Sequence, residues 1–436
     1  MNNKFLAVCQ AFSASDALSN TADRPEPAPF DIAGLSTLVL NGRDYMPKEY
    51  TGPYADALMT SFKNDAYVQA LTKQYKEDLN KGVNDDEASQ NIRKVADAVT
   101  GAVADWKGDA ATRVGLNRFL RVAHSIYKSV KPAANPNNPD LPPLVTFAPT
   151  LRWGPHTLNP MKSREVTGAP IAVVSMPYTY QDHPLLWSAL AHEVGGHDAL
   201  HRRDDIVAEL KTQLQNHYAA IDALHGWNGV WLRFVEEAMA DVCGVLAMGP
   251  SFAVSLLAWL SAVQRIGIPG PVPVLGTVGT HFRIRAGEVQ DDHPPDLLRI
   301  YVAMGVVDAL TYLSPASKQQ WIETLTEVAE AAAGGATTID SYNENGALAL
   351  RYPLEMLAAS AREAGKFIAT VKLITLSGQS IQDLKTWTDD DEAAASAFAA
   401  VDATLTPLQL LAGATMALYD QKADYATLSS VLNQKL

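Results

Sequence analysis

Residue types suited to metal-dependent hydrolysis lie together in the segment HEVGGH, which runs from His192 to His197. A neutral imidazole is a ligand for zinc, and the carboxylate of Glu193 could accept a proton from a metal-bound water. A chain with ten histidines can contain the pattern H-E-x-x-x-H by chance. A zinc centre therefore needs support from a second motif.

The second motif is the run EEAMAD, which begins at Glu236 and Glu237 on another predicted helix. A catalytic zinc ion takes three protein ligands and keeps an open position for water; two histidines and a glutamate from this run meet that need. Asp241 stands four residues after Glu237, on the same helix face, where it can accept the free N–H of a ligating histidine. The two motifs together predict a zinc site.

The five-residue spacing of the two histidines requires a distorted helix. At about 100° per residue, residues i and i+5 of a regular α-helix lie about 140° apart and could not bind one ion. A one-residue insertion, a π-bulge, brings them to the same side, and such bulges are frequent at functional sites. Gly195 and Gly196 lie where the insertion is needed and have no Cβ to oppose it.

Two alternatives explain less of the sequence. Glu193, His197 and His201 follow one another at four-residue steps and could bind a metal on an undistorted helix. That set leaves His192 and Glu237 without a role. Alternatively, the histidines could form a local ion pair with the neighbouring acid on a partly buried helix. This second alternative leaves the glycine pair and the EEAMAD run unexplained.

Together, H-E-x-x-G-H and the later E-E-x-x-A-D resemble the paired motifs of the dipeptidyl peptidase III family of zinc exopeptidases. The pattern H-E-[IV]-G-x-H with a later E-E-[GA]-[LM]-A is also similar to the tubulin tyrosine carboxypeptidases and their bacterial relatives. Both resemblances extend from about Ile171 to the helix with the second motif. Met239 stands where the first family usually has a basic residue, and this chain is well short of that family's typical length.

The resemblance implies a role for each residue of the two motifs. It implies one zinc ion per chain with the ligands His192, His197 and Glu237, and Glu193 as the general base. It further implies that Asp241 supports His192 and that Glu236 supports His197. The implied activity is that of a gluzincin-like zinc metallopeptidase, in which Glu193 takes a proton from the zinc-activated water and passes it to the leaving amine.

Other residues could complete such a site. His293 precedes Pro294 and Pro295 at a predicted helix start, and the run HPP-x-x-x-R is similar to a segment of membrane-associated zinc peptidases of the gluzincin class. His293 could instead be a polar helix cap. The candidates for stabilising an oxyanion are His293, Tyr301, Tyr178 and Tyr180. The candidates for binding a substrate carboxylate are Arg152, Arg233 and Arg299.

The elements around the motifs predict a mainly α fold (α+β) with a zincin-like catalytic core. Strands are expected at Leu144–Phe147 and Ile171–Met176, directly before a helix that starts near His183. An extended peptide could pair with the strand Ile171–Met176. We expect an irregular arm and helical lobe over 1–140, the catalytic core over 141–310 and a helical lobe over 311–436.

Outside the core, the sequence predicts helices and few strands. Residues 1–50 favour irregular structure with one strand at Ser36–Leu40, because they are rich in Pro, Asn and Gly. Residues 267–279 favour a loop. Apolar spacing predicts helices at Ala55–Leu79, Asp86–Trp106, Ala110–Val130, Ser317–Ala333 and Leu348–Ala364, and a helix start capped by Thr388.

The composition excludes several partners. The 436 residues carry a formal net charge of −13, which argues against binding to nucleic acid or docking onto an anionic membrane. The uncharged stretch from Val242 to Gln264 is interrupted at Gly249-Pro250, so two buried helices are expected rather than a stable membrane insertion. Two cysteines and no clear cleavage site favour a cytoplasmic protein.

Three functions remain open from the sequence. The first is a zinc-dependent peptidase that acts on a peptide or protein substrate. The second is a zinc hydrolase of a non-peptide amide or ester, which the same residues could serve. The third is a non-catalytic helical binding protein that retains a zinc site. The presence of Glu193 favours the first two, because a non-catalytic site has no use for a general base.

Overall fold

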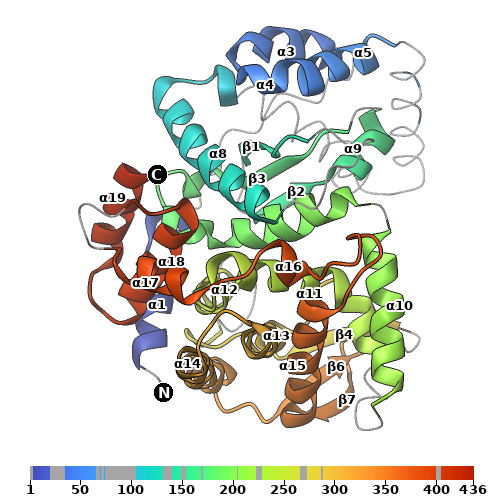
Figure 1. Cartoon of the computed structure of the whole chain (residues 1–436), viewed down its shortest axis with the longest axis vertical. Coiled ribbons are helices and arrows are strands. Elements are labelled where there is room, and N and C mark those ends of the chain that lie inside the picture. The colour runs from blue at the N-terminus through green and yellow to red at the C-terminus, as the bar shows by residue number, and fades with distance from the viewer. Residues whose placement is uncertain are drawn as a thin grey trace.

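The computed structural model describes residues 3–19, 35–64, 69, 73, 105–130, 140–148, 154–167, 170–203, 205–221, 228–265, 273–285, 288–398 and 404–436. Within these ranges the chain is mainly helical and contains two small sheets (Figure 1). This agrees with the mainly α class that the sequence predicts.

The helices extend from the first described residues to the last. The α-helices are α1 (Asn3–Ser13), α2 (Asp16–Ser19), α3 (Leu35–Gly42), α4 (Lys48–Tyr50), α5 (Ala57–Phe62), α8 (Ala110–Val130), α9 (Pro160–Thr167), α10 (Ile206–Ala219), α11 (Asn228–Met248), α12 (Ser251–Val263), α13 (Asp296–Ala309), α14 (Pro315–Ala333), α15 (Leu354–Thr370), α16 (Ile381–Leu384), α17 (Asp389–Ser396), α18 (Pro407–Tyr419) and α19 (Tyr425–Lys435). The segment Ala191–Ala199 is a π-helix, called η6 below, flanked by the 3-10 turns η5 (Pro184–Ser188) and η7 (Leu200–Arg202).

The first sheet lies directly before η6, as predicted. It contains β1 (Leu144–Ala148), β2 (His156–Leu158) and β3 (Val173–Pro177) in the order β1-β3-β2. β1 runs parallel to β3, with Leu144 opposite Val173, and β2 runs antiparallel to it. The β-branched runs predicted β1 and β3, but β2, with only three residues, was not predicted.

The strand order changes the expected docking of a peptide. We predicted that the strand Ile171–Met176, which is β3 here, could pair with a substrate. That prediction is wrong, because β3 is buried and already pairs with β1 on one side and β2 on the other. Among the described strands of this sheet, β2 keeps its second edge unpaired, and it lies against η6.

The second sheet was not predicted. It contains β4 (His281–Arg285), β5 (Glu288–Val289), β6 (Thr338–Tyr342) and β7 (Leu348–Pro353) in the order β5-β4-β6-β7. The predicted helix Leu348–Ala364 is therefore wrong in its first part, and α15 begins only at Leu354. A tight turn closes the β6-β7 hairpin, since the side chain of Asn343 accepts the N–H groups of Asn345 and Ala347. Nearly all residues of β7 are exposed, so its sequence has no alternation of buried and exposed positions. Only its pairing with β6 identifies it as a strand.

The N-terminal region is more regular than predicted. α1 buries Phe5, Val8 and Phe12 at helical spacing and packs against α12 and α18. α3 covers the residues predicted as the strand Ser36–Leu40, whose short apolar run fits either structure. Both predictions for this region are corrected. The predicted helices Ala55–Leu79 and Asp86–Trp106 lie mostly outside the described residues. Of the predicted loop 267–279, residues 267–272 lie outside them, and residues 273–279 contain no helix or strand, as predicted.

The uncharged stretch forms two buried helices, as predicted. α11 ends at Met248 and α12 begins at Ser251, with Gly249 between them at a φ of 67°. Within the described residues, no helix is long and apolar enough to cross a membrane. Thr388 caps α17 as predicted, with its side chain accepting the N–H of Asp391.

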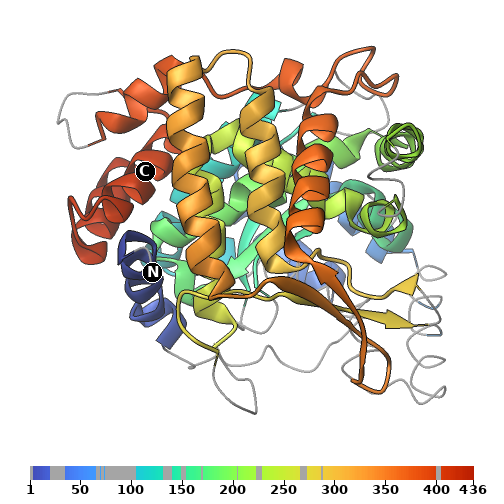
Figure 2. The same cartoon turned by 90° about the horizontal axis from the view of Figure 1, so that it is seen from below.

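The motif helices lie in the interior of the molecule. η6 packs against α8 and β2 on one side and α11 on the other. α13 and α15 cover α11 from the opposite side, and α14 packs on α13 (Figures 1 and 2). The two motifs therefore face each other across the contact between η6 and α11.

Candidate metal centre

The structure contains the helical distortion that the histidine spacing requires. Both histidines belong to η6, a π-helix of nine residues. In a π-helix the hydrogen bonds run from i to i+5, so residues five apart lie on the same side. The prediction of an inserted residue at Gly195-Gly196 is confirmed, and the insertion extends over the whole segment.

The glycine pair has a second role that the sequence did not reveal. A Cβ atom at Gly196 would lie 2.3 Å from the Cα and Cβ of Ala240 on α11, closer than any van der Waals contact allows. At Gly195 the nearest atom would be the Cβ of Cys243, at 3.1 Å. The two residues therefore also let η6 approach α11 closely enough for the two motifs to meet.

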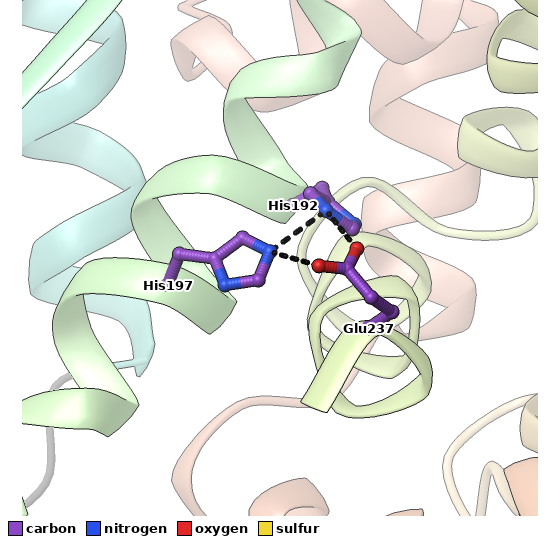
Figure 3. Close-up of side chains that lie close together, drawn as sticks. All are labelled: His192, His197 and Glu237. Carbon is purple, nitrogen blue, oxygen red and sulfur yellow. Dashed lines mark hydrogen bonds and ion pairs between the residues drawn. The ribbon is translucent and has the colours of Figure 1, made fainter. Parts of the chain in front are cut away.

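Three side chains converge at this contact (Figure 3). His192 Nε2 lies 3.0 Å from His197 Nε2 and 3.3 Å from Glu237 Oε2, and His197 Nε2 lies 3.4 Å from Glu237 Oε1. Ligands about 2.0–2.1 Å from a tetrahedral zinc ion are separated by about 3.3 Å. The three groups could therefore hold a metal ion with little movement.

The charge state of the three groups also suits a cation. Burial opposes ionisation of Glu237, but His192 and His197 outweigh it and hold its pKa well below 4.5. Glu237 Oε2 is buried and has no hydrogen-bond partner within the described residues. Burial lowers the pKa of His197, but Glu236 and Glu237 outweigh it and raise that pKa to about 10. The three groups therefore favour positive charge at the point where they meet, as metal ligands do.

Asp241 supports His192 from behind. Its Oδ1 lies 2.9 Å from His192 Nδ1, which leaves Nε2 facing the other two ligands. Arg299 of α13 holds the same carboxylate, with Nε 2.8 Å from Oδ2 and Nη2 2.6 Å from Oδ1. Burial raises the pKa of Asp241, but Arg299 outweighs it, and the pKa is lowered. Arg299 is buried in this pair, so it does not present itself to a substrate carboxylate.

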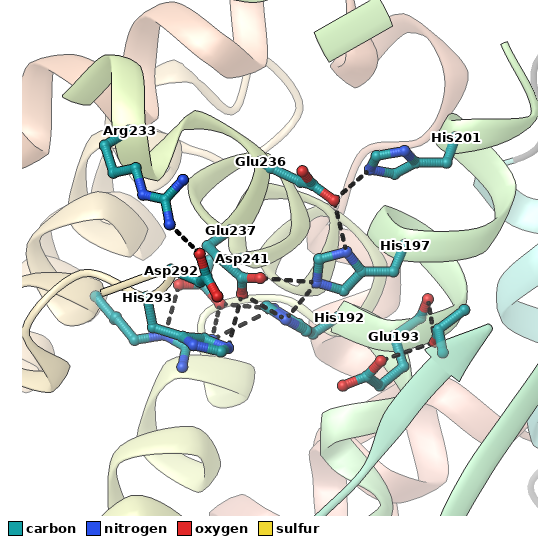
Figure 4. Close-up of polar contacts among 12 residues, drawn as sticks. His192, Glu193, His197, His201, Arg233, Glu236, Glu237, Asp241, Asp292 and His293 are labelled. Carbon is teal, nitrogen blue, oxygen red and sulfur yellow. Dashed lines mark hydrogen bonds and ion pairs between the residues drawn. The ribbon is translucent and has the colours of Figure 1, made fainter. Parts of the chain in front are cut away.

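Glu236 contacts His197 on the opposite side of the ring. Its Oε1 lies 3.8 Å from His197 Nδ1 and 3.2 Å from His201 Nε2 (Figure 4). The position behind His197 agrees with the supporting role that the resemblance implies. His201 thus belongs to the surroundings of the site, but it faces Glu236 rather than Glu193.

Glu193 points from η6 toward the first sheet. Thr157 Oγ1 of β2 lies 2.7 Å from Glu193 Oε2, and Glu193 is buried. The alternative metal set of Glu193, His197 and His201 is not brought together. Among the described residues, the groups whose ligand atoms lie within 4.8 Å of one another are His192/His197/Glu237 and His197/His201/Glu236.

Of the residues predicted to stabilise an oxyanion, His293 lies beside the proposed ligand Glu237. Its Nε2 is 3.2 Å from Glu237 Oε2, and its side chain is 60% exposed. Tyr301 is half-buried on α13, where burial and, to a smaller extent, Glu330 of α14 raise its pKa. Tyr180 is buried and its hydroxyl accepts the indole N–H of Trp259.

Arg233 holds the segment that carries His293. Its guanidinium donates to the carbonyl oxygens of Gln290 and Asp291 at 3.3 and 3.2 Å, and it pairs with the side chain of Asp292. Arg233 stands one helical turn before Glu237, so α11 positions both a ligand and this segment. The third predicted carboxylate clamp, Arg152, lies outside the described residues.

Sequence reasoning missed the contacts of Thr157 and Arg233. No motif surrounds Thr157, and its role depends on the pairing of β2 with β3.

Comparison of the whole chain with protein-family models, curated proteins and solved structures gives no match.

Proposed function

We propose that this protein is a zinc-dependent peptidase. The observation that carries the proposal is the convergence of His192, His197 and Glu237, from two helices that a π-helix and a glycine pair bring together. Two imidazoles and one carboxylate form a ligand class typical of catalytic zinc, which keeps a fourth position open. When bound, zinc would lower the pKa of a coordinated water and polarise the scissile carbonyl.

In this proposal Glu193 is the general base. It directly follows the ligand His192, and the hydroxyl of Thr157 donates to its Oε2. The second oxygen, Oε1, is then the atom that accepts the water proton and later passes it to the leaving amine. Thr157 restricts the rotation of the carboxylate, so Glu193 meets the water in one orientation.

His293 is proposed to stabilise the negative charge that develops on the carbonyl oxygen. It lies beside Glu237 with its side chain mostly exposed, so a bound substrate can reach it. Burial lowers the pKa of His293. Arg233 keeps the segment 290–292 against α11 and so keeps His293 at the ligands.

An extended peptide is the substrate that fits the elements around the site. Among the described strands, the second edge of β2 has no partner, so it can add a peptide strand through main-chain hydrogen bonds. Thr157 of the same strand contacts Glu193, so a peptide on this edge would lie next to the general base. This edge replaces β3 as the proposed docking strand.

Hydrolysis assays test the proposed function. The zinc-loaded protein should cleave members of a mixed peptide library, and Glu193→Gln should reduce kcat by about 10³-fold or more while zinc stays bound. A control, Glu344→Gln on the exposed β6-β7 turn, should keep full activity. Cleavage of simple esters or amides without any peptide cleavage would favour the non-peptide hydrolase. Equal activity of Glu193→Gln and wild type would contradict the mechanism.

A further inference from the structure

A second group of metal-ligating side chains lies directly beside the first and shares one residue with it. His197, His201 and Glu236 each offer a ligand atom within 4.8 Å of the other two. His197 takes part in the first site through Nε2 and in this second group through Nδ1. The imidazole ring of His197 therefore separates two groups of metal-ligand type.

The second group is incompletely satisfied by the protein itself. His201 Nε2 is buried and has no hydrogen-bond partner within the described residues, although Glu236 Oε1 lies 3.2 Å away. The ring centroids of His197 and His201 lie 5.9 Å apart and the ring planes are at 27° to each other, so the two rings stack beside Glu236. Figure 4 shows Glu236 reaching toward both rings from α11. A divalent cation would satisfy this buried ring nitrogen together with the carboxylate that faces it.

We propose that Glu236, His201 and the Nδ1 of His197 bind a second divalent cation of the zinc class. The ligand set is again two imidazoles and one carboxylate, which suits a four-coordinate ion with one position for water. The distances from Glu236 Oε1 to His201 Nε2 and to His197 Nδ1, 3.2 and 3.8 Å, bracket the value of about 3.3 Å expected between ligands of a tetrahedral zinc. This inference rests on the proposed function only in that His197 also serves the first ion.

Binding of the second ion would require the loss of a proton from His197. With an ion at Nε2, the neutral ring would carry its proton on Nδ1, on the side of Glu236. For Nδ1 to serve as a ligand, that proton would have to leave to solvent. Because this proton must be displaced, the second ion should bind more weakly than the first.

The two sites also differ in their access to solvent. The side chain of Glu236 is 40% exposed, whereas that of Glu237 is 12% exposed. An ion can therefore reach the second group from solution while the first site is filled. A more exposed ligand also holds a cation less tightly, since water competes for it.

Zinc binding to the purified full-length chain tests the proposal. The metal-free protein is equilibrated with Zn²⁺ over a range of free concentrations, and bound zinc is measured by mass spectrometry of the element. Wild type should bind two ions, with the second at least tenfold weaker. His201→Ala and Glu236→Gln should each bind one, with circular dichroism used to verify folding. His281→Ala, which removes an exposed histidine on β4, should still bind two.

The outcomes separate this proposal from the proposed function. If wild type binds a single ion at every concentration, or if both variants still bind two, the second site is wrong and the first is untouched. If His192→Ala retains one weak ion while His201→Ala retains one tight ion, the two sites are distinct as proposed. A wild type that binds no zinc overturns both sites.

Discussion

At the scale of single residues, the site depends on contacts made from outside the two motifs. Thr157 orients Glu193, Asp241 orients His192 through a pair with Arg299, and Arg233 holds the His293 segment. The motifs identified the proposed ligands and the proposed base. They could not reveal Thr157, because a three-residue strand with no alternation gives no signal of its own.

Replacing Thr157 tests the orientation of the general base. Thr157→Val keeps the shape of the side chain but removes the donor to Glu193, so we expect kcat to fall about tenfold, or about 1.4 kcal/mol in activation free energy. KM and zinc content should change little, since the proposed ligands and the main chain of β2, which would bind the peptide, are unaltered. Thr157→Ser should restore most of the rate. An unchanged kcat in Thr157→Val would show that this hydroxyl does not orient the base.

At the scale of elements, the local distortion was predictable but its packing was not. The pattern H-E-x-x-x-H predicts a π-type insertion at the glycine pair, because residues five apart must share one face. The close contact of Gly196 with Ala240 depends on α11, which lies some 40 residues later in the sequence. The second sheet escaped prediction for a related reason, since β7 is recognisable only through its pairing with β6.

Gly196→Ala tests that packing. The added methyl would lie 2.3 Å from Ala240, so η6 and α11 must separate. We expect the free energy of unfolding to fall by about 1–3 kcal/mol and zinc affinity to fall by at least tenfold. Gly195→Ala is the matched control, because its added methyl would lie 3.1 Å from the nearest atom, the Cβ of Cys243. It should lower the free energy of unfolding and the zinc affinity less than Gly196→Ala does. Thermal unfolding and chelator competition measure the two effects; equal behaviour of the two variants would contradict the packing argument.

The start of α16 supplies a pH-dependent contribution to stability. Asp383 pairs with Lys372 and accepts the backbone N–H of Ser380, and these contacts lower its pKa to about 2. The interaction is therefore present above about pH 4 and is lost as pH falls toward 2. Asp383→Asn should reduce the free energy of unfolding by about 0.5–1 kcal/mol at pH 7, and the difference should shrink below pH 4. A constant difference across this range, measured by denaturant unfolding, would exclude the charge as its cause.

At the scale of the whole molecule, distant segments close around the motif helices. α1 packs on α12 and α18, so the first described residues join the interior built by much later ones. The sequence predicted an irregular arm there, because residues 1–50 as a whole are rich in residues that break helices. The fold class was predictable from apolar spacing, whereas this long-range packing was not.

Phe12→Ala tests whether α1 is part of the core. Phe12 is fully buried and contacts the ring of Tyr425 on α19 at 6.0 Å between centroids. Its truncation should lower the free energy of unfolding by about 3–5 kcal/mol. Gln10→Ala, at an exposed position of the same helix, should stay within about 0.5 kcal/mol of wild type. A small effect of Phe12→Ala in denaturant unfolding would mean that α1 is only loosely attached.

The central claim is that His192, His197 and Glu237 hold a catalytic zinc ion. The most direct test is the metal content of the chain purified without chelator and then dialysed at low free zinc, for wild type, Glu193→Ala and Glu237→Ala. We predict about one tightly held zinc per chain in the wild type and in Glu193→Ala, and a loss of most zinc in Glu237→Ala, with all three variants folded. A wild type without zinc, or a Glu237→Ala variant that binds zinc as tightly as wild type, would contradict the account.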